Sequence, residues 1–291
     1  MAARNARPRR QRLDAELVRR GLARSRTEAA RLVESGRVTV AGAPATKPAT
    51  GVTLDVALVV REDPGDPAYV SRGGHKLAGA LAVFGPLGLQ VAGRRCLDAG
   101  ASTGGFTDVL LREGASEVVA VDVGYGQLAW SLRSDERVQV HDRTHVRDLT
   151  PDRVGGAVDL VVGDLSFISL RLLLGPLVGV THPDGDLALM VKPQFEVGKD
   201  RVGKGGVVRD PALHAESVLG VVAEAAGLGW GLRAVTTSPL PGPSGNVEFF
   251  VWLRRGAAVA DPEALERLVA DEVRRGPGAA SPSEPGERLT P

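Results

Sequence analysis

The stretch from Arg94 to Asp122 constrains the fold more than any other part of this 291-residue chain. A short apolar run around Cys96 leads into a glycine-rich turn at 98–105, a helical pattern at 106–112 and a second apolar strand at 118–121. A strand, a glycine turn, a helix and a second strand form half of a mononucleotide-binding unit. The stretch therefore predicts an α/β fold with a parallel sheet.

The polar residues of this turn indicate which ligand it would bind. A dinucleotide-binding turn favours the pattern GxGxxG, whereas here an acid, Asp98, precedes glycines at positions 100, 104 and 105. An acid ahead of the turn suits a cationic ligand without phosphate groups, such as S-adenosylmethionine. Asp122, about 20 residues further on, ends the second strand and is placed to hold two ribose hydroxyls. The alternative is a tight turn that binds nothing, which the acid at Asp122 disfavours.

These positions give a set of candidate cofactor contacts. The predicted contacts at the methionine end of S-adenosylmethionine are Asp98, Gly100, Ser102, Thr103 and Gly105, and the predicted ribose contact is Asp122. Asp142, after the third predicted strand, is a candidate for the adenine, and an ordinary loop carboxylate is an equally good interpretation. No cluster of His and Cys residues has the spacing of a metal site, so no metal cofactor is expected.

The net charge of +1 conceals a difference between the two ends of the chain. Residues 1–60 carry 12 Lys and Arg side chains against 5 Asp and Glu, and residues 61–291 carry 24 against 30. A basic surface attracts nucleic acid. The N-terminal part is therefore the candidate nucleic-acid surface, and the remainder is mildly acidic.

The sequence also favours one cellular compartment. The single cysteine, Cys96, excludes a disulfide framework and agrees with a reducing, cytoplasmic compartment. The arginine-rich N-terminus has no apolar signal region after it, which argues against secretion. The longest uncharged stretches, 77–93 and 172–183, are interrupted by Gly-Pro pairs and fall short of a membrane-spanning helix. We expect a cytoplasmic, monomeric protein that does not enter a membrane.

Two short helical patterns and a strand fill the N-terminal part. The first helix covers residues 12–20 and ends at Gly21, and the second starts at the capping box of Ser25 and Glu28 and ends at Gly36. This segment, which contains RLD, GLARSRTEA and GRVTV, resembles the S4-type RNA-binding domain. The resemblance implies RNA binding through guanidinium groups, which fit a phosphate backbone, and a basic helix pair without a partner is the alternative. The candidate RNA-binding residues are Arg20, Arg24, Arg26, Arg31 and Arg37.

The rest of the chain continues the α/β rhythm. Further strands are predicted at 138–140, 158–162 and 187–191, with helical patterns between them. The last two strands, 230–237 and 247–253, are joined by a turn-rich loop without room for a helix, so they should run antiparallel. A mostly parallel sheet closed by one antiparallel hairpin is the layout of Rossmann-like S-adenosylmethionine-dependent methyltransferases.

Composition predicts the domain boundaries. The residues EDPGDP have the polar, proline-rich character of a linker, and the two ends of the chain have the composition of disorder. The predicted parts are a basic disordered arm (1–11), a small α+β S4-like domain (12–60), a linker (61–68), a methyltransferase domain (69–275) and a disordered tail (276–291).

Polar residues stand where the predicted parallel strands end. In open α/β sheets the ligand lies over the carboxyl ends of the strands, so these residues should face one crevice. They are Asp98, Asp122, Asp164 and Lys192. Four polar strand ends beside uninterrupted apolar strands indicate a functional site.

The residues around these positions carry a family resemblance. Lys76 in YVSRGGHKL, Asp164 in VDLVVGDLSF, Lys192 in LALMVKPQFE and Glu248 in GNVEFFVWL resemble, in order and context, the Lys-Asp-Lys-Glu tetrad of the FtsJ-like RNA 2′-O-methyltransferases. With the S4-type segment in front, residues 11–255 resemble the TlyA family of rRNA cytidine 2′-O-methyltransferases, whose members have also been called haemolysin A.

This resemblance implies a reaction and a partner. A methyl group would pass from S-adenosylmethionine to the ribose 2′-hydroxyl of cytidine in 16S or 23S rRNA, or both, within ribosomal subunits. Because a 2′-hydroxyl is a poor nucleophile, its proton must be removed or its developing charge balanced as it attacks. Lys192 is the candidate for either role, with Asp164 orienting it. Glu248 would hold the ribose hydroxyl or Lys76, and no metal is required.

Two other functions come from different classes. One is a membrane-acting cytolysin, as the haemolysin name indicates, and the other is an RNA-binding protein with a decayed methyltransferase fold. A cytolysin needs a spanning or strongly amphipathic segment, which no stretch supplies. A decayed fold would lack part of the tetrad or of the glycine turn, and both are complete here.

Overall fold

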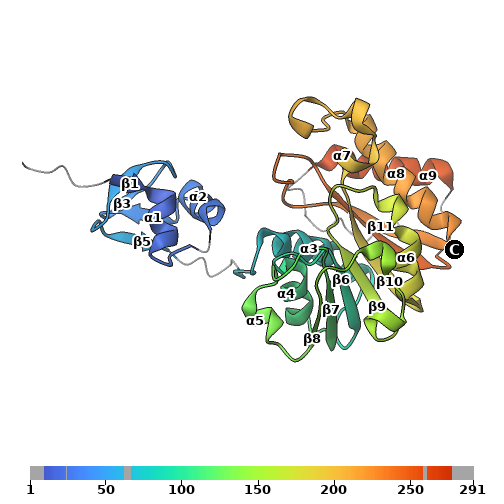
Figure 1. Cartoon of the computed structure of the whole chain (residues 1–291). Coiled ribbons are helices and arrows are strands. Elements are labelled where there is room, and N and C mark those ends of the chain that lie inside the picture. The colour runs from blue at the N-terminus through green and yellow to red at the C-terminus, as the bar shows by residue number, and fades with distance from the viewer. Residues whose placement is uncertain (1–9, 24, 62–66, 258–260, 277–291) are drawn as a thin grey trace, which may run out of the picture. The chain divides into compact units, whose positions relative to one another are not determined.

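The chain folds into two compact units, Met1–Ala68 and Tyr69–Pro291 (Figure 1). The structure is a computed structural model that describes residues 10–23, 25–61, 67–257 and 261–276. Most of the predicted arm, most of the predicted linker and nearly all of the predicted tail lie outside these residues. Arg10 and Gln11, predicted to lie in the arm, instead belong to strand β1 (Arg10–Arg12), because β1 pairs antiparallel with β4 (Gly51–Thr53).

The N-terminal unit has two helices, a three-stranded sheet and the β1–β4 pair. Ser25 caps the second helix by accepting a hydrogen bond from the N–H of Glu28 at 3.2 Å, as the capping box predicts. Leu17, Ala29 and Val38 lie in its separate hydrophobic core. Its helices are α1 (Leu13–Arg19) and α2 (Arg26–Glu34), and its sheet has the order β3 (Ala43–Pro44), β2 (Val38–Val40), β5 (Leu58–Val60).

The C-terminal unit is built on a seven-stranded sheet. Its order is β11-β12-β10-β9-β6-β7-β8, and only β12 runs antiparallel to its neighbours. The predicted antiparallel hairpin is therefore confirmed, and β12 inserts between β10 and β11. The strands are β6 (Arg95–Ala99), β7 (Glu117–Val121), β8 (Val138–His141), β9 (Val158–Gly163), β10 (Thr181–Val191), β11 (Trp230–Thr237) and β12 (Phe249–Arg255).

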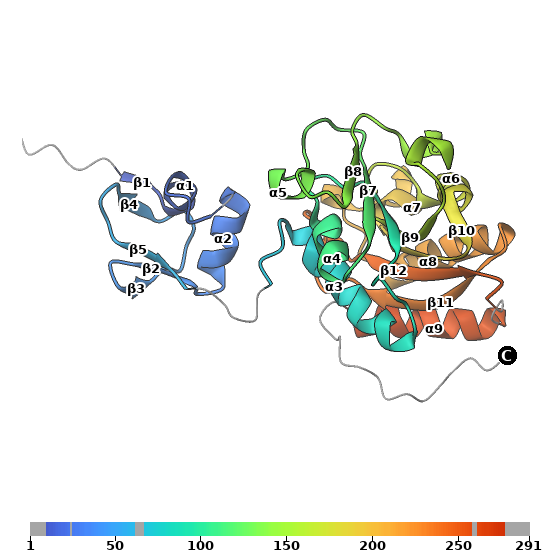
Figure 2. The same cartoon turned by 90° about the horizontal axis from the view of Figure 1, so that it is seen from below.

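Helices cover both faces of this sheet and bury a separate core on each (Figures 1 and 2). Side chains of a strand point alternately to the two faces, so in β6 Cys96 belongs to the core with α3 and α4, and Leu97 to the core with α6, α8 and α9. The helices are α3 (Arg72–Phe84), α4 (Gly105–Arg112), α5 (Trp130–Arg133), α6 (Leu174–Val180), α7 (Pro193–Glu196), α8 (Pro211–Gly227) and α9 (Pro262–Arg275). Burial on both faces explains why the strands read as continuous apolar runs.

Candidate active site

The strand order reverses between β6 and β9, and the candidate site lies at the carboxyl ends of these strands. Ala99 and Gly163 pair across this point. The N–H of Asp164 donates to the carbonyl oxygen of Ala99 at 3.1 Å. The turn after β6 and the loop after β9 therefore start side by side, in the position where open α/β sheets bind ligands.

Two glycines of the turn after β6 are required by close contacts within the protein. Gly100 has a φ of 86°, and a Cβ there would lie 3.0 Å from the carbonyl oxygen of Asp164. A Cβ on Gly105 would lie 2.8 Å from the backbone nitrogen of Gly74 in α3. The turn can thus approach both the loop after β9 and the start of α3 only because these residues lack side chains.

Asp122 follows β7 and holds the turn in place. Its Oδ2 accepts a hydrogen bond from the N–H of Ser102 at 2.8 Å, and its Oδ1 accepts one from the N–H of Gly124 at 2.7 Å. Each carboxylate oxygen can accept a second hydrogen bond. Asp122 is half-buried and at the edge of the sheet, so it keeps the capacity to bind ribose hydroxyls.

Asp98 is completely buried in β6. Its Oδ2 accepts a hydrogen bond from Thr107 Oγ1 at 2.7 Å, and its Oδ1 accepts none from any described residue. Burial raises the pKa of Asp98 to about 7; the hydrogen bonds from Thr107 oppose this rise, and the charges of Asp164 and Asp122 add to it. An unpartnered buried carboxylate oxygen fits a cationic ligand group.

We expect Asp98→Asn to change the pH dependence of stability. The pKa of Asp98 rises from 3.8 in the unfolded chain to about 7 in the folded one, so between these pH values only the unfolded chain releases the proton. The folded wild-type protein therefore loses stability as the pH rises through this window, at about 1.4 kcal/mol per pKa unit.

Asn cannot ionise, so the free energy of unfolding of Asp98→Asn should not show this loss. Relative to wild type, the free energy of unfolding of the variant should therefore rise by a few kcal/mol between pH 4 and pH 7, at about 1.4 kcal/mol per pKa unit. Urea unfolding without cofactor across this range measures it. The matched control is Asp148→Asn, because Asp148 has a side chain that is 58% exposed. If the free energies of unfolding of Asp98→Asn and wild type changed with pH in the same way, the expectation would be contradicted.

Two further candidate cofactor contacts lie near the turn. Thr103 is exposed, and its carbonyl oxygen accepts a hydrogen bond from the N–H of Ala129 at 3.2 Å. Asp142 follows β8, and its Oδ2 lies 2.6 Å from Nη2 of Arg133, whose hydrogen bond lowers the pKa of Asp142. Asp142 therefore has a partner in the protein and stands at the correct edge of the sheet, which leaves both interpretations of its role open.

Lys76 and Glu248 form a buried ion pair. Nζ of Lys76 in α3 lies 2.5 Å from Oε2 of Glu248, and the two side chains are 7% and 1% exposed. A lysine at this position of a helix is usually a surface residue with its amine in water. Two charges buried together must compensate each other, and removing one alone costs about 3–5 kcal/mol. This pair thus fixes α3 to the segment in front of β12.

Lys192 and Asp164 form a second ion pair. Nζ of Lys192 lies 2.5 Å from Oδ1 of Asp164 and donates a hydrogen bond to Oγ of Ser166 at 2.8 Å. Lys192 is almost completely buried, whereas the side chain of Asp164 is 23% exposed. The amine is therefore held at the boundary between the protein interior and solvent, by two oxygens of one loop.

The sheet brings the two ion pairs to the same edge. Val191, the last residue of β10, pairs with Phe249, the first residue of β12. Lys192 follows Val191 and Glu248 precedes Phe249, so the two residues lie next to each other where the pairing of β10 and β12 ends. All four tetrad residues thus lie where β9, β10 and β12 meet the start of α3.

Sequence patterns did not identify several residues that shape this site. Ser166 accepts a hydrogen bond from the Lys192 amine and is its second oxygen partner beside Asp164. In the sequence, only its position two residues after Asp164 could have indicated this role. Asn246 is buried, accepts a hydrogen bond from the N–H of Val208 at 2.9 Å and donates one to the carbonyl oxygen of Gly206 at 2.8 Å. It thereby ties the segment before Glu248 to the loop after α7.

The candidate RNA-binding arginines differ in their surroundings. Arg20 donates to Glu16 and to the carbonyl oxygens of Val56 and Leu54, each at 2.7 Å, so each of its three guanidinium nitrogens makes a hydrogen bond within the fold. Arg26 is exposed, with Nη2 3.1 Å from the buried Asp14. Arg24 lies outside the described residues. Arg31 and Arg37 are half-buried.

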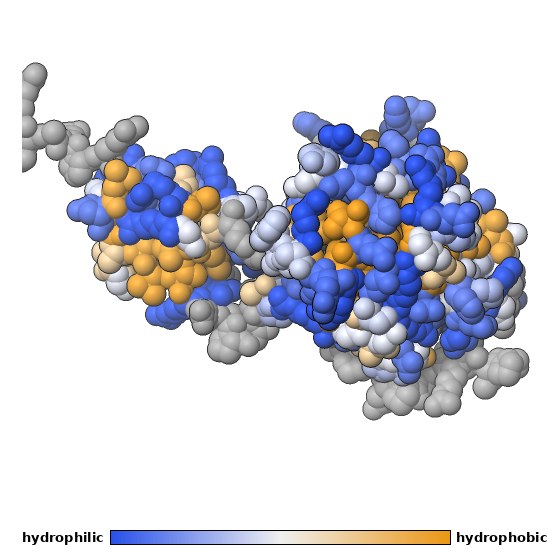
Figure 3. All heavy atoms as spheres, turned by 60° about the horizontal axis from the view of Figure 1, so that its bottom comes forward, coloured by the Kyte–Doolittle hydropathy of each residue, from blue (hydrophilic) through white to orange (hydrophobic). Residues whose placement is uncertain are grey.

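Hydrophilic and hydrophobic residues separate on the N-terminal unit. In the space-filling view, hydrophilic residues cover one part of this unit and hydrophobic residues another (Figure 3).

Two buried carboxylates, Asp14 and Glu16, each hold two arginines, and these hydrogen bonds lower the pKa of each carboxyl group to about 2. Both carboxylates therefore stay charged at neutral pH and keep arginines ordered on the surface of the unit.

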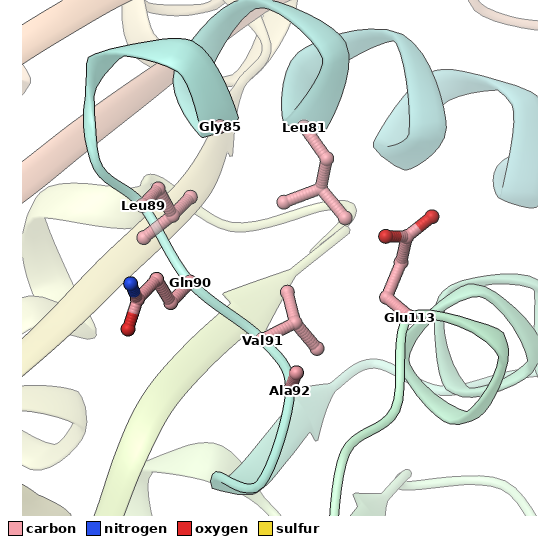
Figure 4. Close-up of a pocket in the computed structure, with 7 residues that line it drawn as sticks. All are labelled: Leu81, Gly85, Leu89, Gln90, Val91, Ala92 and Glu113. Atoms are coloured by element: carbon pink, nitrogen blue, oxygen red, sulfur yellow. The ribbon is translucent and has the colours of Figure 1, made fainter.

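A cavity of about 360 Å³ lies away from this site. Its lining includes Leu81 of α3, Leu89 and Val91 ahead of β6, and Glu113 at the end of α4 (Figure 4). These residues are at the amino end of β6, whereas the polar strand ends are at its carboxyl end. The cavity is thus not part of the candidate active site.

The described ranges contain no group of three or more His, Cys, Asp and Glu residues that could hold a metal ion. Within the same ranges, no helix has both the length and the apolar character needed to cross a membrane.

Comparisons with known proteins agree with the fold. Residues 69–255 match the FtsJ-like methyltransferase family, and residues 11–56 match the S4 domain. The 16S/23S rRNA (cytidine-2′-O)-methyltransferase TlyA of Mycobacterium tuberculosis is 60% identical over 270 residues, which cover 92% of this chain and 99% of the relative. Hemolysin A of Brachyspira hyodysenteriae is 34% identical, over 82% of this chain and 97% of the relative.

A solved structure is similar over both units. The Streptococcus thermophilus protein named "Putative hemolysin" has a TM-score of 0.70 and 36% identity, over 92% of this chain and 97% of that chain. The resemblance inferred from the sequence motifs is confirmed by the matched families and by the identity to full-length relatives. The chain belongs to the TlyA family of FtsJ-like methyltransferases, which carry an S4 domain in front of the methyltransferase domain.

Proposed function

We propose that this chain transfers a methyl group from S-adenosylmethionine to the ribose 2′-hydroxyl of cytidine in 16S or 23S rRNA, or both, within ribosomal subunits. The observation that carries the proposal is the meeting of two lysine–carboxylate ion pairs, one buried and one partly exposed, at the carboxyl edge of the sheet. The name of the 60% identical Mycobacterium tuberculosis relative supports the substrate. The enzyme would act where ribosomal subunits are made, in the cytoplasm.

Lys192 would act on the attacking hydroxyl. Its amine stands within 2.8 Å of two oxygens on one loop, so its direction is fixed before substrate arrives. An ammonium group held in this way balances the negative charge that develops on the oxygen, and once it has released a proton to solvent the neutral amine can take the 2′-hydroxyl proton. Asp164 and Ser166 orient the amine.

The second ion pair would complete the site. Glu248 holds Lys76 at 2.5 Å, so Lys76 adds a second positive charge at this edge without being free to move. A fixed charge costs no reorganisation during the reaction. A protein that only binds RNA would have no need of a buried Lys76–Glu248 pair and a nearly buried Lys192 here, since burying these charges carries a large desolvation cost.

The donor groups around the turn fit S-adenosylmethionine, which supplies an electrophilic methyl group when bound. Asp98 offers a buried, unpartnered oxygen to the cationic methionine end. Asp122 offers acceptor capacity to the ribose. The Asp98 carboxylate at the turn would repel a phosphate, which disfavours a dinucleotide cofactor.

The N-terminal unit would bind the RNA backbone. Its residues 1–60 carry 12 Lys and Arg against 5 Asp and Glu, whereas the rest of the chain has an excess of acids, and exposed Arg26 is held on its surface by Asp14. Guanidinium groups on short helices suit phosphates, and they do no chemistry on the ribose. The unit therefore supplies affinity for the ribosomal subunit.

Purified protein, S-adenosylmethionine and unmodified ribosomal subunits test the proposal. We expect new 2′-O-methylcytidine in the rRNA, mapped by nucleotide-resolution methylation sequencing. Asp122→Ala should raise the S-adenosylmethionine concentration that gives half the maximal rate by at least about tenfold, equivalent to about 1.4 kcal/mol.

The matched control for this variant is Asp148→Ala, which removes an exposed acid of the same unit and should leave the concentration dependence unchanged. Subunits that gain no methylated cytidine would overturn the proposed function. An unchanged half-maximal concentration in Asp122→Ala would remove only the ribose assignment.

A further inference from the structure

The loop after β9 and the segment that starts at Lys192 are joined at three places along their length. At the first place, the Lys192 amine contacts Asp164 and Ser166. At the second, the rings of Phe167 and Phe195 lie 5.4 Å apart. At the third, Glu196 binds residues 169–171. These contacts are made by side chains, so the conformation of the loop depends on them.

Glu196 makes the most extensive of these contacts. Its Oε1 accepts a hydrogen bond from the N–H of Leu170 at 2.7 Å, and its Oε2 accepts one from Ser169 Oγ at 2.6 Å. Arg171 donates to the same carboxylate oxygen at 3.2 Å and to the Glu196 carbonyl oxygen at 3.1 Å. The side chain of Glu196 is only 3% exposed. A buried carboxylate with this many partners fixes the far end of the loop firmly.

The loop between the two fixed ends is strained. Phe167 has a φ of 64°, in the left-handed region that a residue with a bulky side chain rarely adopts, and it is 92% exposed. Such a conformation costs about 1–3 kcal/mol and persists only where surrounding contacts enforce it. The Phe167 ring contacts Phe195 but stays almost fully exposed, so this contact contributes little to holding the conformation. The contacts at Lys192 and at Glu196 are therefore what hold the loop.

We propose that Glu196 is a positioning residue for methyl transfer: by holding residues 169–171, its carboxylate keeps the loop after β9 in the strained conformation that places Asp164 and Ser166 on the Lys192 amine. This inference rests on the proposed function, because it concerns the same reaction. Glu196 does not itself touch the reacting atoms. Its effect passes through the orientation of Lys192.

Removal of the Glu196 carboxylate should slow the chemical step and leave binding intact. A displacement of reacting groups by about 1 Å can cost on the order of 100-fold in rate. In Glu196→Ala we expect the single-turnover rate constant, at saturating S-adenosylmethionine and ribosomal subunits, to fall by about 10- to 100-fold. The affinity for each substrate should change by less than about threefold.

A double-mutant cycle separates positioning from a general loss of structure. If Glu196 acts through Lys192, then Glu196→Ala should cost nothing further in a Lys192→Ala background, because there is no amine left to orient. A merely structural role would slow Lys192→Ala as much as it slows the wild type. Glu196→Gln, which keeps the reach of the side chain to Leu170 and Ser169, should recover most of the rate.

Glu216→Ala is the matched control. Glu216 also pairs with an arginine, since Arg201 lies 2.6 Å from it, but it is 54% exposed on α8 and has no contact with the loop after β9 among the hydrogen bonds and ion pairs of the described residues. Its variant should react at the wild-type rate. A Glu196→Ala rate equal to that of Glu216→Ala would overturn the inference, as would a Glu196→Ala loss that persists in the Lys192→Ala background.

If Glu196→Ala does not fold, Glu196→Asp decides in the same cycle, because its shorter side chain cannot reach both Ser169 and the N–H of Leu170. A loss that disappears with Lys192→Ala supports the inference, and a wild-type rate or a persisting loss overturns it. Failure of the proposed function has a different signature, because the wild-type protein would then transfer no methyl group to the subunits.

Discussion

Lys192→Ala should slow methyl transfer by about 10²- to 10⁴-fold, the range expected for loss of one group that moves or balances a proton. The physical reason is that the Lys192 amine is oriented by Asp164 and Ser166 and stands at the edge where the ribose would bind. Its removal deprives the transition state of a charge that the ground state does not need. Single-turnover transfer of labelled methyl groups to purified ribosomal subunits measures the effect.

Binding of both substrates should hardly change in this variant, because the amine acts at the reacting atoms and not on the remote parts of either ligand. Lys204→Ala, which removes an exposed lysine of the same unit, is the control and should keep the wild-type rate at saturating substrates. Near-normal turnover by Lys192→Ala would mean that the tetrad only positions substrate. Lys76→Ala is a less clean probe, since it leaves Glu248 buried without its partner and should destabilise the fold.

Removal of residues 1–60 should abolish methylation of intact subunits, with a fall of at least about 100-fold in kcat/KM at physiological salt, because several interactions with phosphates disappear together. The remaining chain should still fold and bind S-adenosylmethionine, since the N-terminal unit has its own hydrophobic core and contains no tetrad residue. Circular dichroism, calorimetry and the methylation assay measure the three properties. Full methylation by the shortened chain would contradict a role in RNA binding.

A full-length variant without some of the N-terminal arginine charges separates the loss of these charges from the loss of the whole unit. Replacing Arg24, Arg26 and Arg31 with glutamine should weaken subunit binding and flatten its dependence on salt by about one slope unit for each arginine that binds a phosphate. The matched variant is Arg20→Gln. Arg20 donates to Glu16 and to two carbonyl oxygens, so its replacement should lower the stability of the N-terminal unit and leave the salt slope unchanged.

The parts of the fold that local pattern decides could be predicted from the sequence. Apolar runs mark β6 and β7, and the glycine turn with Asp98 and Asp122 marks the unit between them. The antiparallel hairpin could be predicted because its connecting loop leaves no room for a helix. That β12 lies between β10 and β11 could not, since strand order is decided by packing of the whole sheet.

The sequence could indicate candidate residues for the site by their type and position, but it could not indicate which of them contact each other. Lys76 and Glu248 are 172 positions apart in the chain, and no periodicity connects them, so their ion pair emerges only from the folded sheet. Ser166 and Glu196 carry ordinary loop and helix patterns, and their importance lies in where the loop after β9 passes. The contacts of Arg20 were equally hidden from the sequence, because its guanidinium group binds the backbone oxygens of Val56 and Leu54 only in the folded unit.

The position of Cys96 has a practical consequence for studying how the two units cooperate on a ribosomal subunit. The thiol is buried in β6, and burial raises its pKa to about 12, so almost none of the reactive thiolate forms at neutral pH. It is also the only cysteine of the chain. Fluorescent or spin labels attached to cysteines introduced on the surface of each unit would therefore report on those sites alone, and distances between the units could be followed without first removing a native thiol.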